Sequence, residues 1–159
     1  IIIDTGPSLR YGTELLHLAR GLNPKGAAAL VNTHHHPDHF FGNQAFDGVP
    51  VYALGETRVL AEIHGDAFAD NMYLILGDWM RGTEIVPPTE AISGDITIGG
   101  RTLRALPLGG HTEADLALLD MDTGTLIGAN ILAARSLMMI ARFTQLNGVM
   151  AQASSINTA

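Results

Sequence analysis

Residues 31–43, VNTHHHPDHFFGN, concentrate side chains that bind metal ions. Four of the seven histidines and one aspartate fall within residues 34–39, with Thr33 before them and Pro37 among them. Imidazole nitrogens and carboxylate oxygens are ligands that zinc takes in proteins. Because the chain has no cysteine, a metal site would have to be built from these groups. A purification-tag remnant would be terminal and uninterrupted, and a merely polar loop would not need the aspartate or the proline.

The spacing of these residues indicates two neighbouring ligand groups. His34 and His36 are two positions apart at the end of an expected strand, where side chains at i and i+2 point the same way. Both rings can therefore meet one metal ion. Asp38 and His39 follow at an expected helix start and form a second group. A helical pairing of His35 with His39 is the rival reading, but it would place proline inside a helix, at a cost of ~3 kcal/mol.

A third nitrogen ligand is expected from His111, which lies in the glycine-rich stretch LGGHTEADLAL. The two glycines before it let the backbone approach closely and leave the ring unshielded. Catalytic zinc keeps three protein ligands and leaves one position for water, and His111 would complete such a set. Without the cluster at residues 34–39, His111 would be interpreted as a hydrogen-bonded core or loop residue. His17 and His64 are expected at the surface, and His35 is expected to point towards solvent or behind the ligands.

The elements that position these residues indicate a layered α/β fold. Apolar β-branched runs alternate with amphipathic helix patterns and later give way to hairpin patterns around glycine turns. The expected order is strand 1–4, helix 9–20, strand 27–32, helix 37–46, strand 50–54, helix 56–79, loop 84–92, and hairpins 95–108 and 115–130. The long helix is expected to bury Val59, Leu60, Ile63, Phe68, Met72, Leu76 and Trp79.

The composition of the chain argues against nucleic-acid and membrane partners. A net charge of −7 without a basic cluster argues against nucleic acid, and no run reaches the roughly 18 apolar residues of a membrane span. We therefore expect a small-molecule substrate. The opening IIIDTG reads as the end of a buried strand, so the chain is expected to be a fragment. A lost N-terminal signal would make the protein periplasmic or secreted, and otherwise it is expected in the cytoplasm.

These motifs resemble the metallo-β-lactamase superfamily over residues 1–132. THHHPDH matches its T-H-x-H-x-D-H signature, IIIDTG precedes the first helix, and GGHT stands at the third ligand. IDTGPS, VNTHHHPDHFFGNQAF and GDWMRGTE are most similar to the branch of quinoprotein relay system zinc metallohydrolases. The resemblance implies the N-terminal half of an αβ/βα sandwich. Residues 133–159 are expected to be a tail that starts helical and then frays. The uncovered sheet face would pack against residues 131–143 or a partner in a homodimer.

The resemblance also implies roles for the motif residues. His34, His36 and His111 look like the ligands of a first metal ion, and Asp38 and His39 look like those of a second. With zinc bound, Asp38 is expected to hold a water molecule and carry its proton during hydrolysis of an ester, thioester or amide bond. Two alternatives stay open: a non-haem iron oxidoreductase on the same scaffold, and a metal-binding domain that is catalytically impaired.

Residues outside the signature complete the expected site. Asp4 looks like the aspartate that orients a ligating imidazole, although a turn residue in DTGP is the other reading, and Thr33 is expected beside it behind the ligands. The family places a bridging aspartate where this chain has Asn130, and a neutral amide cannot supply a bridging charge. The family's last histidine ligand has no counterpart after His111. The sequence therefore favours one zinc ion over a two-metal centre.

Overall fold

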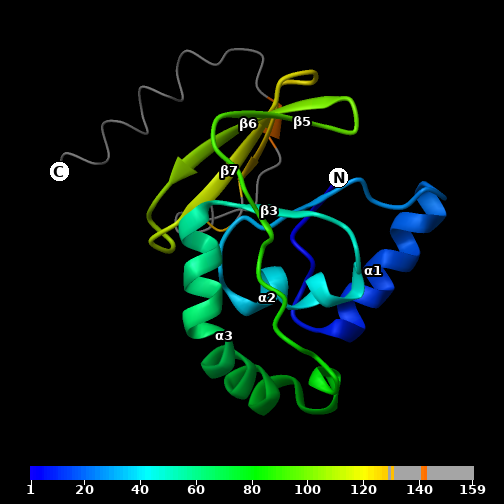
Figure 1. Cartoon of the computed structure of the whole chain (residues 1–159), viewed down its shortest axis with the longest axis vertical. Coiled ribbons are helices and arrows are strands. Elements are labelled where there is room, and N and C mark those ends of the chain that lie inside the picture. The colour runs from blue at the N-terminus through cyan, green and yellow to red at the C-terminus, as the bar shows by residue number, and fades with distance from the viewer. Residues whose placement is uncertain (129, 131–140, 143–159) are drawn as a thin grey trace.

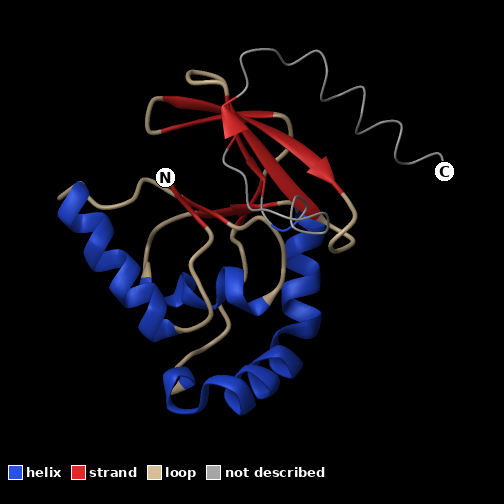
Figure 2. Cartoon of the chain, turned by 180° about the vertical axis from the view of Figure 1, so that it is seen from behind, coloured by secondary structure: helices blue, strands red, loops and turns tan. Residues whose placement is uncertain are grey.

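The computed structural model describes residues 1–128, 130 and 141–142, and it shows a helix layer, a first sheet and a second sheet (Figure 1). Seen from behind, the helices lie on one side of the first sheet and the second sheet lies on the other (Figure 2). In the part of the chain that is described, no helix covers the outer face of the second sheet. This arrangement confirms the expected α/β class and corresponds to half of a four-layer sandwich.

The first sheet is parallel and is covered by helices that connect its strands. Its order is β1 (Ile2–Ile3), β2 (Leu30–Val31), β3 (Val51–Ala53) and β4 (Glu90–Ala91). The connecting helices are α1 (Leu9–Leu22), α2 (Pro37–Phe40), η1 (Phe41–Ala45), α3 (Gly55–Leu76) and η2 (Gly77–Met80). Parallel neighbours require such crossovers, and helices on one face leave the other face free for the second sheet.

The second sheet is antiparallel and contains both expected hairpins. Its order is β5 (Asp95–Ile98), β6 (Arg101–Leu108), β7 (Asp115–Asp120), β8 (Thr125–Gly128) and β9 (Ala141–Arg142). Gly99 and Gly100 turn the first hairpin with φ of 57° and 80°, a backbone region that glycine enters without steric cost. Apart from β9, the expected tail lies outside the described residues.

The core between the two sheets joins residues from both. Its buried members are Val31, Leu54, Ile92, Leu103, Ala105, Ala114, Leu116 and Leu118. β7 is the most buried strand of the second sheet, and Leu116 and Leu118 are fully inaccessible. Because β7 follows the loop that carries His111, the docking of the sheets also places that loop over the end of β2.

Three expectations about the elements were wrong. The expected loop over 84–92 contains edge strand β4, which follows the two prolines rather than including them. The expected helix 37–46 divides into α2 and the 3-10 segment η1. Of the residues expected to be buried by the long helix, Leu60, Phe68, Met72 and Leu76 do pack against the core, while Trp79 lies in η2 and is exposed by 44%. Val59 and Ile63 are exposed by 52% and 66%, because the residues that α3 buries most deeply are small. Gly65 is one of these, and a Cβ there would lie 2.9 Å from Ile85 Cδ1.

Among the described residues, none of the helices has the length and apolar character needed to cross a bilayer.

Helix α1 approaches η1 closely through a pair of glycines. Ser8 caps the helix by accepting from the Tyr11 backbone N–H at 3.3 Å. Farther along the helix, a Cβ on Gly12 would lie only 2.3 Å from the carbonyl oxygen of Gly42. The backbone atoms of η1 cannot move aside as a flexible side chain would. This contact brings the first turn of α1 against the segment that follows the histidine cluster.

Gly12→Ala is expected to destabilise the protein by about 1–3 kcal/mol, because the added methyl group overpacks a backbone contact. Gly21→Ala is the matched control in the same helix, since no atom lies within 4 Å of its Cβ position. That control is expected to be neutral or stabilising by up to about 1 kcal/mol. Denaturant unfolding of both variants measures the difference. Equal effects at the two positions would contradict the close contact.

Candidate metal centre

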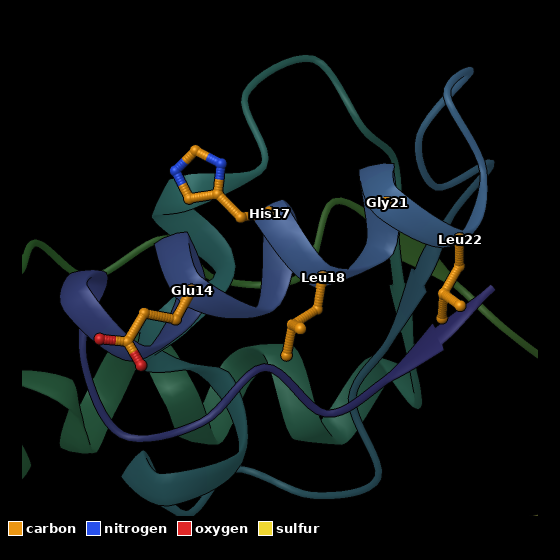
Figure 3. Close-up of a pocket in the computed structure, with 5 residues that line it drawn as sticks. All are labelled: Glu14, His17, Leu18, Gly21 and Leu22. Atoms are coloured by element: carbon orange, nitrogen blue, oxygen red, sulfur yellow. The ribbon is translucent and has the colours of Figure 1, made fainter.

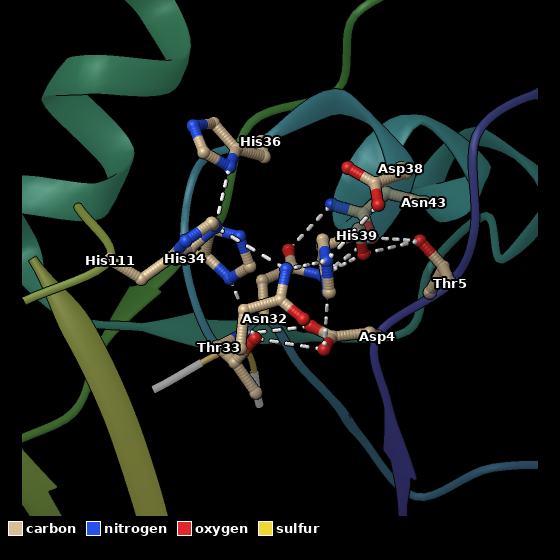
Figure 4. A network of polar contacts seen from close by, with 11 residues as sticks. Asp4, Thr5, Asn32, Thr33, His34, His36, Asp38, His39, Asn43 and His111 are labelled. Carbon is tan, nitrogen blue, oxygen red and sulfur yellow. Dashed lines mark hydrogen bonds and ion pairs between the residues drawn. The ribbon is translucent and has the colours of Figure 1, made fainter. Parts of the chain in front are cut away.

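The histidine cluster forms where the two sheets meet, at the carboxyl end of β2 (Figure 4). His34 and His36 follow β2, and Asp38 and His39 lie in the first turn of α2. His111 enters from the loop between β6 and β7. The backbone N–H of Leu116 donates to the carbonyl oxygen of Thr33 at 2.8 Å, so a hydrogen bond joins the two ligand-bearing segments directly.

The three histidines expected to share a metal ion converge in the structure. One nitrogen from each of His34, His36 and His111 lies within 4.8 Å of the other two. His36 Nδ1 and His111 Nε2 are 2.9 Å apart, and the ring centroids of the three pairs are separated by 4.7–4.9 Å. The i, i+2 geometry inferred from the sequence therefore does direct the first two rings to one point.

His34 presents a bare nitrogen to this point. The Asp4 carboxylate can only accept, so the Thr33 hydroxyl donates to it at 2.8 Å, and the Thr33 oxygen accepts from His34 Nδ1 at 3.0 Å. This fixes the proton on Nδ1 and leaves the lone pair on Nε2. That Nε2 atom is buried and has no hydrogen-bond partner among the residues that the structure describes. A buried polar atom without a partner is costly, and a cation bound there would satisfy it.

Burial, and then the neighbouring rings of His39, His36 and His111, lower the pKa of His34 from 6.5 to about 3. The imidazole is therefore neutral at physiological pH, which is the form that binds a metal ion. Burial and then the adjacent His111 also lower the pKa of His36. These shifts make the group suitable for a cation, and the residues present fit a zinc ion with three nitrogen ligands.

Asp4 supports both ligand groups. Its Oδ1 atom accepts from the Thr33 backbone N–H at 2.8 Å, and its Oδ2 atom lies 2.8 Å from His39 Nδ1 as well as from the Thr33 hydroxyl. Its φ of 57° is the one positive value for a non-glycine residue among those described, and aspartate tolerates this region better than most residues. The Asp4 carboxylate therefore contacts one ligand candidate, His39, directly and reaches His34 through Thr33.

The Asp38–His39 group is held together by a proton. His39 Nε2 lies 3.3 Å from Asp38 Oδ2 while Nδ1 faces Asp4. Burial alone lowers the pKa of His39, but the bonds to Asp38 and Asp4 outweigh it and raise that pKa to about 9. The bond to His39 in turn lowers the pKa of Asp38. A second cation would have to displace this proton.

Asn130 contacts one histidine from each group. Its amide nitrogen is 3.3 Å from His39 Nε2 and 3.3 Å from His111 Nε2. An amide at this place adds no negative charge between the two groups.

His35 was expected to point either towards solvent or behind the ligands, and the structure excludes the first alternative. It is only 5% exposed, and its Nδ1 atom has no hydrogen-bond partner among the described residues. The ring packs 5.2 Å from His36, 5.8 Å from His64 and 5.9 Å from Phe68, measured between centroids. His64 and Phe68 belong to α3, so that helix covers the side that could have faced solvent. His64 itself is exposed on α3, as expected, and His17 is exposed on α1.

A buried amide network behind His39 was missed. The carbonyl oxygen of His39 accepts from the Thr5 backbone N–H at 2.8 Å and from Asn32 Nδ2 at 3.1 Å. Asn43 uses its amide fully: Oδ1 accepts from Thr5 and Asn32, and Nδ2 donates to Asn32 Oδ1 and to the Val86 carbonyl. The asparagines on either side of the histidine motif were the available signal, since buried amides occur where they are fully bonded.

Asp115 was also missed. It is 1% exposed and accepts the backbone N–H groups of His111 and Thr112, each at 2.9 Å. The sequence offered a signal, because an aspartate precedes the apolar run LALL and lies four residues after His111.

A surface hollow of about 730 Å³ lies on the outer face of α1 (Figure 3) and is lined by Glu14, His17, Leu18, Gly21 and Leu22, all from that helix. A second hollow of about 500 Å³ is lined by Gly55, Glu56, Val59, Leu60 and Glu113. Because Glu113 belongs to the loop that carries His111, the second hollow borders that loop.

Comparison with known proteins identifies the family. The sequence model described as the metallo-beta-lactamase superfamily matches residues 1–151. The chain belongs to the metallo-β-lactamase superfamily. A linear primary-alkylsulfatase from Pseudomonas sp. (strain ATCC 19151) is 39% identical over 62 residues, covering 39% of this chain and 12% of that protein. The acyl-coenzyme A thioesterase MBLAC2 from Bos taurus is 29% identical over 152 residues, covering 82% of this chain and 53% of that protein.

Solved metallo-β-lactamase structures have the same fold. The metallo-beta-lactamase from Pontibacter korlensis is 30% identical, with a TM-score of 0.58, over 79% of this chain and 52% of that chain. The present chain thus spans about half or less of the length of these relatives. The quinoprotein relay branch stays a prediction.

Two histidines of the metal-free protein are expected to give its stability a maximum near pH 6.5. His39 is protonated in both states below 6.5, and from there to about 9 only the folded state keeps the proton, so stability falls as pH rises. His34 is neutral in both states above 6.5, and below it only the unfolded state takes the proton, so stability falls as pH decreases towards about 3. Urea unfolding at a series of pH values, in the presence of a chelator, measures the free energy of unfolding as a function of pH.

His39→Gln is the matched variant for this experiment. It is expected to flatten the alkaline side of the pH profile and to reduce the loss of stability on the acid side, because the His39 ring helps to lower the pKa of His34 and its bond lowers the pKa of Asp38. An unchanged loss of stability between pH 6.5 and 9 in this variant would show that His39 does not hold the proton.

Proposed function

We propose that this chain carries the metal-binding part of a zinc-dependent hydrolase that cleaves an ester, thioester or amide bond in a small molecule. The observation that carries the proposal is the buried Nε2 atom of His34, which has no hydrogen-bond partner in the described part of the chain, in a group of three histidines whose ligand nitrogens lie within 4.8 Å of one another. The names of two relatives, an alkylsulfatase and an acyl-coenzyme A thioesterase, support ester and thioester bonds as the first classes to test.

The three imidazoles would hold the zinc ion. Bound zinc lowers the pKa of a water molecule towards ~7 and stabilises negative charge that develops on a carbonyl oxygen. The chain of hydrogen bonds from Asp4 through Thr33 keeps the His34 proton on Nδ1, so that Nε2 is free to bind the metal ion. Groups that hydrogen-bond to metal-binding histidines have this role in zinc enzymes. Three nitrogens favour zinc over non-haem iron, because the common iron site takes two histidines and a carboxylate.

Asp38 is the residue we assign to proton transfer. Its carboxylate is 58% exposed at the mouth of the site, and its pKa is lowered, mainly by the bond to His39, so it is ionised at neutral pH. An ionised carboxylate can accept a proton from water and return it to the leaving group. Substrate would reach this position beside the His111 loop, where the hollow lined by Val59 and Leu60 offers an apolar surface.

A second candidate is a domain that binds metal without catalysing a reaction. The position of Asn130 favours it, since the neutral amide contacts both ligand groups and cannot compensate two cations. Zinc binding without turnover of esters, thioesters or lactams would support this candidate over the hydrolase.

His36→Ala is expected to abolish stoichiometric zinc binding, because it removes one of three ligands. The wild-type protein is expected to hold about one zinc per chain after dialysis, as a three-histidine site predicts. Native mass spectrometry together with elemental analysis measures both. His17→Ala, an exposed histidine on α1, is the control and should keep full occupancy. Two tightly held zinc ions per wild-type chain would contradict the one-metal proposal.

Asn130→Asp is expected to add a second zinc ion and to raise the hydrolysis of nitrophenyl esters and acyl thioesters, because it supplies the charge that the amide lacks. Titration calorimetry and absorbance assays report the two effects separately. Asn130→Ala removes the amide without adding charge and should gain neither property. If Asn130→Asp binds a second metal ion and remains inactive, the domain that binds without catalysis is the better description.

A further inference from the structure

His111 is held in place differently from the other two proposed ligands. His34 is 1% exposed and fixed by packing, whereas the residue at position 111 is exposed. It follows Gly110, which has a φ of 142°, in a loop with little packing of its own. The ring can stay near His34 and His36 only if the loop backbone is held in one conformation.

The Asp115 side chain holds that backbone. Its Oδ2 atom accepts from the N–H groups of His111 and Thr112, both at 2.9 Å, and its Oδ1 atom accepts from the Thr112 hydroxyl at 2.7 Å. The Thr112 oxygen then accepts from the Ala114 N–H at 3.2 Å, which closes the loop on itself. Hydrogen bonds to an ionised acceptor are roughly twice as strong as neutral ones.

Asp115 is itself anchored to the rest of the site. It is 1% exposed and opens β7 opposite Leu108 of β6. The next residue, Leu116, donates to the carbonyl oxygen of Thr33, which directly precedes His34. Thr57 of α3 donates to the carbonyl oxygen of Ala114 at 3.2 Å. The backbone on either side of Asp115 is therefore hydrogen-bonded to the segment after β2 and to α3, while Asp115 itself pairs with β6. These contacts fix the place of the carboxylate.

We infer that Asp115 is a positioning residue that sets the place of His111 in the metal site through the loop backbone. The inference rests on the proposed function. A rival role is purely electrostatic, since a buried negative charge near the site would attract a cation through space. The two roles make different predictions, because position depends on where the carboxylate lies and attraction depends mainly on its charge.

Three variants separate these roles. Asp115→Asn keeps the size and removes the charge. Its NH2 group cannot accept from the Thr112 hydroxyl, and the two backbone N–H groups are left with a neutral and therefore weaker acceptor. Asp115→Glu keeps the charge and moves the carboxylate. Asp120→Asn is the matched control, because Asp120 is a buried carboxylate at the other end of β7 that bonds Arg101 and the Asp122 N–H instead.

Both Asp115 variants are expected to bind zinc at least about tenfold more weakly than wild type, because residues that hold metal ligands in place commonly contribute 10–100-fold to metal affinity. The zinc affinity of Asp120→Asn is expected to stay within about threefold of wild type. Competition with a chromophoric zinc chelator measures the affinities. The thermal unfolding temperature of the zinc-free protein is expected to be lower in all three variants than in wild type. A general loss of stability would weaken zinc binding in the control as well, and that result would overturn the inference.

Amide hydrogen exchange gives a readout that needs no metal. In the zinc-free wild-type protein, the N–H groups of His111 and Thr112 should exchange slowly, while the exposed N–H of Glu113, which has no hydrogen bond among the described residues, should exchange fast. The two slow amides should become fast in both Asp115 variants and not in Asp120→Asn. Fast exchange of the His111 amide in wild type would overturn the inference even if the variants fail to fold.

The remaining outcomes are also decisive. If Asp115→Glu binds zinc as tightly as wild type, the charge alone matters and the positioning role is wrong. If wild type shows slow exchange at His111 and binds no zinc, the proposed function fails while the hold of Asp115 on the loop stands.

Discussion

The hydrogen bond from the Thr33 hydroxyl to the Asp4 carboxylate decides how the metal site is arranged. It forces the Thr33 oxygen to accept from His34 Nδ1, so His34 turns an unprotonated nitrogen inwards. That nitrogen sits in a desolvated space beside three other imidazoles, where an added proton would be unfavourable. A metal cation is the charge that this arrangement can accept, because it can bind lone pairs of three rings at once, whereas a proton bridges at most two of them.

The two ligand groups differ in their protonation without metal. Burial and neighbouring imidazoles lower the pKa of His34 to about 3 and also lower that of His36. The Asp38–His39 group keeps a proton between two carboxylates, with Asp4 on one side of the ring and Asp38 on the other. Asn130 contacts both groups without adding charge to either. The proposal of one cation rather than two rests on this asymmetry.

The sequence predicted the parts of the site that depend on local geometry. The i, i+2 spacing of His34 and His36 and the glycine-flanked His111 converge as expected, and both hairpins turn at their glycines. What it could not predict depends on packing between distant elements. His35 is buried because α3 lies over it, and Val59 is exposed because small residues of that helix face the core. The partners of a buried carboxylate likewise appear only when loop and strand are placed together.

The two sheets contribute separate parts of the candidate ligand set, so a bound metal ion would affect how strongly the protein resists proteolysis. The strands of the first sheet are only two or three residues long, so their own ladders offer little resistance to opening. A cation held jointly by residues after β2 and before β7 would act as a cross-link between the layers. Metal supply would then govern how readily cellular proteases degrade the chain, so that copies left without metal are removed preferentially.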